Sequence, residues 1–449
     1  GFFPSFSAAY RISEEAFFEP LRKTVDNLKI RLSYGSLGNQ QIGYYDFIQT
    51  ITTKGSMGDY SFDGTILGQH ATVSDPVSGN QTWEKVISKN LGADLNMFSN
   101  RLSLTADFYI RDTKGILGKG KSLPSIYGAN EPQVNSNNLR TKGYELVLGW
   151  RDSFKLAGST FSYGITGTFS DYTAEYTKCD NPSGLIGDPY VGKKYGEIWG
   201  YKVDGLFRND EEAAEYASRV DLSKVAAGYY SATGAYGKGV RGGDIKYLDL
   251  DGSGIVDGGK GTLEDPGDRR VIGNSSPRYQ YGLTLNLSWY GFDLSVFMQG
   301  IGRLDWYPGA DNLRFWGPYS RPYATFIPKN FMSQVWSESN PDAYLPRARA
   351  YTSLNSTQGT AYYTNDRYLQ NLAYCRLKNL TLGYTIPKRL TSKVGIKECR
   401  VYFSGENLAT WSALKNDFLD PEQAAADSDK KSNVYPWCRT YSVGLNLTF

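Results

Sequence analysis

The sequence predicts an all-β protein, an antiparallel β-barrel that crosses a membrane with strands. Three observations predict it: strict polar/apolar alternation in many segments, connections that alternate between short and long, and an unusual composition. Of 449 residues, 35 are Tyr and 49 are Gly, whereas four are Met and one is His. Abundant Tyr and Gly suit many strands, tight turns and aromatic girdles. No run approaches the ~20 apolar residues of a spanning helix, so a membrane crossing would use strands.

The C-terminal segment 439–449 shows the alternation most clearly. Successive side chains of a β-strand point to opposite faces. One face of this segment is apolar and carries Tyr441, Val443, Leu445, Leu447 and Phe449. The other face is small and polar, with Thr440, Ser442, Gly444, Asn446 and Thr448. A membrane barrel needs that division, because one face of each strand meets lipid and the other meets a watery lumen.

The same pattern recurs along the chain in segments of about ten residues, the length that a tilted strand needs to cross a bilayer. The apolar stripes include Leu28, Ile30, Leu32 and Tyr34; Leu102, Leu104, Ala106, Phe108 and Ile110; Tyr144, Leu146, Leu148 and Trp150; and Leu380, Leu382, Tyr384 and Ile386. Segments 161–169 and 279–289 alternate without a break. Eleven strands are expected, near 2–10, 28–36, 85–97, 101–113, 142–151, 160–173, 279–289, 292–300, 373–386, 398–407 and 439–449.

The connections between these strands alternate in length. Ser99-Asn100 and Tyr290-Gly291 make two short turns, and 152–159 and 387–397 are modest. The 11–27 connection is longer than its position suggests, and we expect a short helix around Glu14–Leu21. The other connections are long and cover 37–84, 114–141, 174–278, 301–372 and 408–438. Outer-membrane barrels have short periplasmic turns and long extracellular loops, so this parity favours a barrel over a soluble β-sandwich.

An odd number of strands predicts an incomplete barrel. Bacterial single-chain barrels have even strand numbers, and two unpaired edges would leave backbone groups bare in lipid. The chain begins at Gly1 without Met or a signal peptide, which indicates an internal start. We therefore expect the remaining strands to come from elsewhere.

Composition argues against several function classes. A formal net charge of +3 with mixed signs gives no nucleic-acid footprint. Cys179, Cys375, Cys399 and Cys438 lack metal-ligand spacing; unpaired thiols or one disulfide are both open. No nucleophile elbow, phosphate loop or metalloprotease motif is present, and the one histidine, His70, is expected in a solvated loop. The sequence does not predict an enzyme.

Several motifs in order over nearly the whole chain resemble the C-terminal half of a SusC/RagA-type TonB-dependent transporter from a Bacteroidetes outer membrane. They include GDIKYLDLDGSGIVD at 243–257 and LKNLTLGYTIP at 377–387. The other matching stretches are Gly1–Glu15, Leu28–Gln40, Asn138–Glu145, Val271–Tyr279 and Ser404–Leu408.

The resemblance implies that residues 1–449 supply about 11 C-terminal strands of a 22-stranded barrel in a Gram-negative outer membrane, with the plug domain and N-terminal strands absent. It implies TonB-dependent import, a SusD-like surface lipoprotein as a lid, and an oligosaccharide or sometimes a peptide as ligand. Lipid and lipopolysaccharide would surround the barrel. Phe449 would be the signal for membrane insertion. The same strands and loop parity would also fit a passive porin or structural barrel, and a secreted carbohydrate-binding β-protein is a third possibility.

Asp249, Asp251, Ser253, Ile255 and Asp257 have the spacing of a calcium loop, which wraps hard oxygen ligands around one ion. The acid at position 12 is missing, since Lys260 stands there. Glu264, Asp265 or Asp268 could replace it if the glycines between fold back. The alternative is a plain Asp/Gly turn held by side-chain-to-backbone hydrogen bonds.

The 301–372 loop is dense in aromatic residues, and Trp306, Tyr307, Phe315 and Trp316 are candidate ligand contacts. Flat rings beside polar groups suit sugars, although the rings could equally pack together or against a lid protein. The 174–278 loop, with a helix expected at Asp210–Arg219, suits a lid-docking surface. Residues expected in the aromatic girdles are Tyr109, Trp150, Trp289, Tyr290 and Tyr384.

Overall fold

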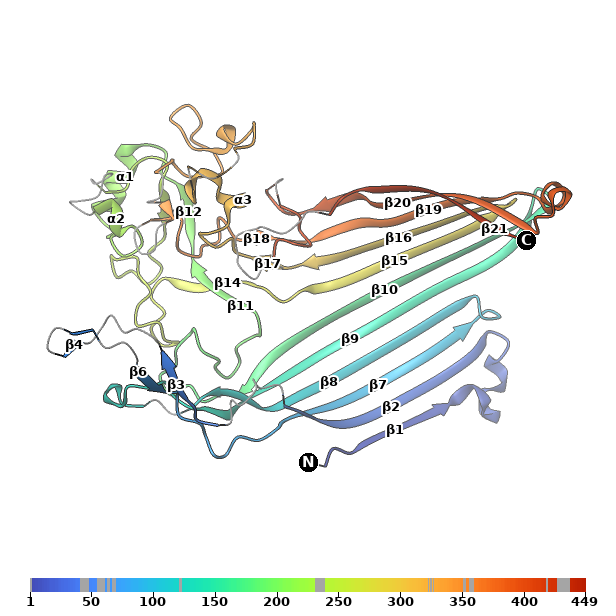
Figure 1. The fold of residues 1–449 in the computed structure, drawn as a ribbon, viewed down its shortest axis with the longest axis horizontal. Helices are drawn as coiled ribbons and strands as arrows, with labels where there is room; N and C mark the ends of the chain where they lie inside the picture. Colours follow the sequence, from blue (N-terminus) through green and yellow to red (C-terminus); the bar gives the residue numbers. More distant parts are fainter. Residues whose placement is uncertain are drawn as a thin grey trace.

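Eleven strands form a single antiparallel sheet in a computed structural model of the chain (Figure 1). The structure describes residues 2–40, 48–54, 61–62, 65–66, 70–120, 123–230, 239–321, 323, 325, 327–349, 353–354, 359–416, 419–425 and 437–449, without the side chains of residues 54, 61, 62, 65, 66, 70 and 125. Each strand pairs with the next of the eleven in chain order, and β1 and β21 are the two edges.

All eleven predicted strands are confirmed. They are β1 (Ser5–Arg11), β2 (Val25–Asn39), β7 (Glu84–Met97), β8 (Leu102–Lys119), β9 (Gln133–Leu156), β10 (Ser159–Lys178), β15 (Arg278–Trp289), β16 (Phe292–Arg303), β19 (Tyr374–Thr385), β20 (Glu398–Ser412) and β21 (Thr440–Thr448). Several run well past the expected ten residues, and β9 reaches 24. The additional residues lie mainly toward the long connections, where polar side chains continue the ladder beyond the apolar stripe.

The remaining elements are short and lie mostly in the connections. The short strands are β3 (Ile51–Lys54), β4 (Ser61–Phe62), β5 (Thr65–Ile66), β6 (His70–Val73), β11 (Glu197–Tyr201), β12 (Val203–Leu206), β13 (Ile245–Tyr247), β14 (Arg269–Asn274), β17 (Asp305–Trp306) and β18 (Gln370–Asn371). The helices are α1 (Asp210–Ala217), α2 (Ala227–Tyr230), α3 (Leu313–Trp316) and α4 (Lys388–Thr391), with 3-10 turns η1 (Ile12–Glu14), η2 (Ala16–Leu21), η3 (Ser125–Tyr127), η4 (Gly317–Tyr319), η5 (Met332–Gln334) and η7 (Ser392–Val394). Among the described residues, no helix is long and apolar enough to cross a membrane.

The sheet has an apolar face and a polar face, and the strand register keeps them separate. Residues directly opposite one another in an antiparallel ladder share a face. Phe292, Tyr384, Val401 and Leu445 are paired in sequence across four strands, and all lie on the apolar face. Phe292, Val401 and Leu445 are 52%, 41% and 57% exposed. The sheet therefore shows its large apolar side chains to the surroundings instead of burying them.

The polar face is laced by ion pairs between neighbouring strands. Arg31 on β2 donates to Asp94 on β7 at 2.9 Å and to Asp107 on β8 at 2.8 and 2.9 Å. Arg400 on β20 donates to Asp293 on β16 at 2.8 Å. These charges lie opposite the apolar stripe, as a lumen-facing surface requires.

One end of the sheet, the short-turn end, is closed by tight turns. Tyr290 and Gly291 have φ of 49° and 82°, and Ala157 and Gly158 have φ of 49° and 85°, the left-handed pair that two-residue hairpin turns need. The 152–159 connection is thus shorter than expected, because β9 and β10 continue to Leu156 and restart at Ser159. The helical turn expected around Glu14–Leu21 is present as η1 and η2.

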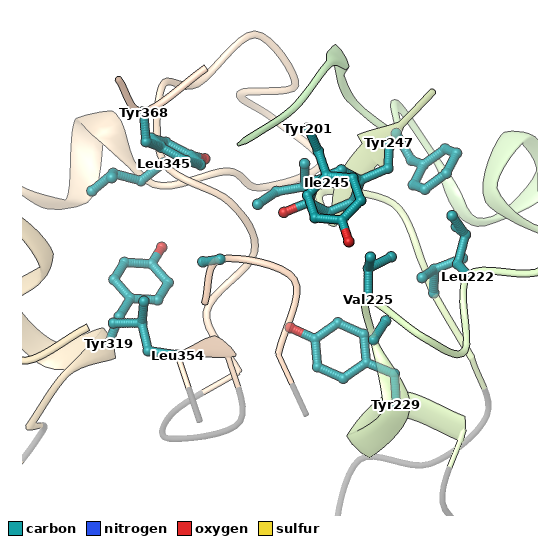
Figure 2. Packing of buried hydrophobic residues seen from close by; sticks show 14 of the residues in the cluster. Tyr201, Leu222, Val225, Tyr229, Ile245, Tyr247, Tyr319, Leu345, Leu354 and Tyr368 are labelled. Carbon is teal, nitrogen blue, oxygen red and sulfur yellow. The ribbon is translucent and has the colours of Figure 1, made fainter. Parts of the chain in front are cut away.

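At the opposite end, the long-loop end, the described parts of residues 179–277 and 304–373 fold together into a unit that we call the loop assembly (Figure 1). Its interior is a hydrophobic core in which Tyr201, Ile245 and Tyr247 of the first segment meet Tyr319, Leu345 and Tyr368 of the second (Figure 2). The helix expected at Asp210–Arg219 is confirmed as α1, and the Asn209 side chain caps it by accepting from the backbone N–H of Glu212 at 2.8 Å.

The four cysteines form no disulfide, which agrees with the thiol alternative. His70 begins β6, and its side chain lies outside the described part of the chain.

Candidate functional site: the loop assembly

A buried ion pair ties the two segments of the loop assembly together. Arg349 donates through Nε to Asp244 at 2.9 Å, and both side chains are at most 5% exposed. The guanidinium also lies over the Tyr229 ring, 4.2 Å from its centre. Burial raises the pKa of Asp244 to about 6, although Arg349 opposes the rise. Because removing one partner would leave the other charge buried and unpaired, loss of either side chain should destabilise the contact between the segments.

Two of the predicted ligand contacts belong to the core of the loop assembly. Phe315 and Trp316 lie in α3 and are 1% and 0% exposed. The Trp316 indole N–H donates to the carbonyl of Pro308 at 3.2 Å, and the ring packs edge-on against Tyr368. Neither ring presents a face that a ligand could stack on in this structure. Their burial favours the alternative of loop packing over direct ligand contact.

Tyr307 and Trp306 lie at the margin of that core. The Tyr307 hydroxyl donates to the Tyr363 carbonyl at 2.9 Å and accepts from the Asn365 amide at 3.1 Å. Burial raises the pKa of Tyr307 well above its ordinary value. Trp306 is half-buried on β17, opposite Gln370 of β18. Ligand contact through these two side chains stays a prediction.

A pocket of about 670 Å³ opens in the loop assembly beside Tyr307. It is lined by rings and by charges of both signs. The lining side chains that carry rings or charges are Trp199, Tyr201, Lys260, Arg269, Tyr307, Asp311, Tyr362 and Tyr363. Small-molecule sites are typically concave and aromatic with a few placed polar groups, and this pocket has that make-up.

Arg269 lines the pocket with a guanidinium that lies against the glycine-rich turn. Its Nη2 donates to the Gly258 carbonyl at 2.7 Å. A Cβ added to Gly258 or Gly261 would meet the guanidinium at about 3.0 Å, so the glycines let the charged group lie close against the backbone. Within the described part of the chain, Nε of Arg269 is buried and has no hydrogen-bond partner. Buried donors are normally paired, so this nitrogen is an exception within the loop assembly.

The predicted calcium loop brings two of its carboxylates together with a third. Oxygens of Asp249, Asp251 and Asp268 lie within 4.8 Å of one another. The third carboxylate belongs to Asp268, one of the three acids that could replace the missing acid at position 12. The chain folds back and places it beside Asp249 and Asp251. Asp268 is fully buried and accepts from the backbone N–H groups of Leu250 and Asp257. Burial raises the pKa of Asp268.

The other predicted calcium ligands of that loop make hydrogen bonds within the turn. The Ser253 hydroxyl donates to the Ile255 carbonyl at 3.0 Å, and Asp257 accepts from the N–H of Gly259 at 2.7 Å. Asp249 likewise accepts from Gly252 and Gly254. These bonds are what a plain Asp/Gly turn predicts, and calcium binding stays a prediction.

The aromatic side chains of the strands divide as the alternation requires. Trp150, Trp289 and Tyr384 lie on the apolar face near the short-turn end, where the Trp150 indole donates to Tyr163 at 3.0 Å, and Tyr290 is in a turn of that end. Tyr109 was misplaced: it pairs with Asn90 and Gly143 on the polar face, because its neighbours Phe108 and Ile110 occupy the apolar one. Phe449 follows β21 and is 71% exposed. Its role as an insertion signal stays a prediction.

Comparison with known proteins shows which proteins the chain is similar to. No family model matches the chain. TonB-dependent receptor P26 of Formosa agariphila is 28% identical over the whole chain, and receptor P3 of the same organism is 26% identical. TonB-dependent receptor SusC of Bacteroides thetaiotaomicron is 22% identical, again over the whole chain. The structure of the RagAB peptide transporter superposes on the whole chain with a TM-score of 0.70 at 21% identity.

The chain spans 40–42% of the length of these curated relatives and 43% of the RagAB chain. The matching region has the same antiparallel sheet, which agrees with the open eleven-stranded arrangement. Over its whole length the chain is therefore similar to the C-terminal part of the outer-membrane β-barrel of SusC/RagA-type TonB-dependent transporters, which agrees with the resemblance of its motifs.

Proposed function

We propose that this chain forms the C-terminal half of a barrel that imports a nutrient across the outer membrane with energy supplied through TonB. The observation that carries the proposal is the match of the entire chain to TonB-dependent receptors, over a sheet that keeps large apolar side chains together on one face across neighbouring strands. Contact with TonB would be made by parts of the transporter outside this chain.

An oligosaccharide is the substrate that we propose. The pocket of the loop assembly offers the rings of Trp199, Tyr362 and Tyr363 for stacking, and the charged group of Arg269 lines the pocket beside them. Sugars stack their C–H faces on flat rings and bond at their edges. An oligopeptide is the alternative: the RagAB structure is described as a peptide transporter, and Lys260 and Asp311 at the same pocket could hold chain termini.

A SusD-like surface lipoprotein is the partner that we propose for the loop assembly. The assembly has its own hydrophobic core and lies at the long-loop end. It therefore offers a preformed surface for a partner, which a set of flexible loops would not. The RagAB complex, to which the fold is similar, supports the idea of a two-component transporter.

The test is uptake by cells that carry the full-length transporter. A panel of oligosaccharides and oligopeptides would be offered, and growth and uptake measured with and without a functional TonB. We expect one class to be taken up only with TonB. A double variant Trp199→Ala/Tyr362→Ala should lose at least tenfold in uptake at equal surface abundance, whereas Trp411→Ala on the apolar face should not. Uptake that persists without TonB would support the passive porin instead.

A further inference from the structure

The apolar face of the sheet ends, toward the long-loop end, in a row of aromatic rings. Phe108 on β8, Tyr144 on β9, Phe169 on β10 and Tyr279 on β15 follow one another with centroid separations of 6.3, 6.0 and 6.5 Å. A second set of rings on the same face, including Phe161 and Tyr163, lies near the short-turn end. From Phe161 to Phe169 the strand covers about 26 Å at ~3.3 Å per residue. At the 35–45° tilt of barrel strands this spans about 20 Å of the bilayer, which fits within the ~25 Å apolar band between two girdles.

Exposed lysines lie beyond that row, toward the long-loop end, on β7, β8 and β9. Lys89 on β7 pairs with Ile110, and Ile110 pairs with Lys142 on β9. Two rungs farther out, Lys85 pairs with Lys114. By the strand alternation, all four lysines share the face of Phe108 and Tyr144. All four are exposed.

The acids on this part of the face are already neutralised. Asp112, between the two lysine rungs, is held by Arg140 at 2.6 Å, and Glu175 on β10 is ion-paired with Lys194. Within the described residues, no ion pair engages Lys85, Lys89, Lys114 or Lys142. The region therefore carries a surplus of about four positive charges on a surface that is level with the end of the apolar band.

Lys85 and Lys114 repel each other across the strand pair, and a bound anion would remove that repulsion. Side chains directly opposite across an antiparallel pair have Cβ atoms ~4.5–5.5 Å apart, and like charges placed there are destabilising. The chain nevertheless places Lys85 and Lys114 opposite each other. An anion bound between the two ammonium groups would replace their mutual repulsion with an attraction between each ammonium group and the anion.

The outermost paired cations of β15 and β16 differ from the four lysines. Arg278 on β15 lies opposite Arg303 on β16. Arg278 is ion-paired with Asp171 through two bonds of 2.6 Å, and Arg303 with Asp305 at 3.0 Å. Both of these arginines therefore have an acid as partner, whereas the four lysines of β7–β9 have none among the described residues.

We propose that Lys85, Lys89, Lys114 and Lys142 form a binding site for the phosphate groups of lipid A in the outer leaflet of the outer membrane. Acyl chains of the lipid would lie along the apolar face below the ring row, and the phosphates would reach the lysines above it. Cations next to a membrane surface attract anionic headgroups with about 1 kcal/mol each, which is about fivefold in affinity for each lysine.

The test uses the purified full-length transporter in lipopolysaccharide-free detergent. Diphosphoryl lipid A, dephosphorylated lipid A and inorganic phosphate are the probes, and bound lipid is counted by native mass spectrometry alongside the thermal midpoint. We expect diphosphoryl lipid A to bind and raise the midpoint, and the other two probes to do so much less. Lys85→Gln/Lys114→Gln should bind lipid A about 25-fold more weakly, while Lys85→Arg/Lys114→Arg keeps the affinity.

Without lipid A, the Lys85→Gln/Lys114→Gln variant should be at least as stable as the parent, because the repulsion is removed; this separates lost binding from misfolding. Lys388→Gln/Lys393→Gln, two exposed lysines near the short-turn end, is the matched control and should change nothing. Equal binding of dephosphorylated lipid A, or of lipid A to the glutamine variant, would overturn the proposal. Saturation by inorganic phosphate alone would reassign the lysines to free phosphate.

Discussion

The sheet and the loop assembly use the same kinds of side chain in opposite ways. On the apolar face of the sheet, Leu445, Phe292 and Val401 are 57%, 52% and 41% exposed. In the loop assembly, Trp316, Tyr247 and Tyr368 are 0% exposed. The sheet is stabilised by its ladders and by transfer of its apolar face into lipid, whereas the loop assembly is stabilised by a water-excluding core. The sheet is therefore adapted to lipid and the loop assembly to water, and the two are joined where the strands leave the membrane.

The largest effect should come from opening a cavity in the loop assembly. Trp316→Ala removes a fully buried ring and should cost about 3–5 kcal/mol. Because that core is separate from the sheet, limited proteolysis of the transporter in membranes should cut residues 179–277 and 304–373 while the barrel keeps its heat-modifiable mobility. Trp411→Ala, at a 56% exposed ring of the apolar face, is the control. Equal protease resistance of both variants would show that the assembly does not depend on its core.

A charge placed on the apolar face should affect the sheet and spare the loops. Ile165 lies between the two ring sets of β10 and is 41% exposed. Ile165→Arg should destabilise the barrel by about 2–4 kcal/mol, the cost of Arg near the bilayer midplane. Denaturant unfolding in lipid vesicles measures it. Thr166→Arg places the same charge on the polar face and should cost much less; a similar loss for both would contradict the assignment of the two faces.

Calcium offers a way to stabilise the loop assembly alone. If the loop of Asp249, Asp251 and Asp268 binds the ion, calcium at ~100 times its dissociation constant should add about 2.7 kcal/mol to that unit. Calorimetry on the intact transporter should show heat that Asp268→Asn abolishes and Asp265→Asn preserves. Absence of heat above buffer would identify the segment as a plain turn.

The smallest effect expected is at the cap of α1. Asn209→Ala removes the side-chain acceptor for the N–H of Glu212 and should cost about 1 kcal/mol. Hydrogen exchange over residues 210–217 should rise, with no change in the strands. Asn209→Asp retains an acceptor and should exchange like the parent. Faster exchange in both variants would mean that the cap bond does not matter.

The strands could be predicted because lipid imposes a period of two on every one of them. The eleven segments, the tight turns such as Tyr290-Gly291 and the helix α1 all follow from local signals: alternation, turn residues and an Asn cap. Strand ends were less predictable, since β9 and β10 continue past the apolar stripe with polar residues that a loop would also accept. Tyr109 was assigned to the aromatic girdle because it is a tyrosine near a strand end. The alternation with Phe108 and Ile110 places it on the polar face instead.

The site could not be predicted to the same degree, because it depends on contacts between distant segments. A loop rich in rings does not say which rings face inward, and Phe315 and Trp316 proved to be core. Trp199, Arg269 and Tyr362 meet at the pocket from segments far apart in the chain, and no local pattern marked them. Asp268 was one of three acids that could complete the calcium loop. Only the three-dimensional path of the glycine-rich turn shows that it lies beside Asp249 and Asp251.

The order of the chain has a consequence for biogenesis. The core of the loop assembly combines Tyr201 and Ile245, which precede β15, with Phe315 and Tyr368, which follow β16. The β15–β16 hairpin must therefore have carried both segments to the far side of the membrane before the core can close. Contacts of such large sequence separation form slowly, and this core can close only after both segments have crossed. A newly inserted barrel would pass through a stage in which its membrane part is complete and its surface part is still open to proteases.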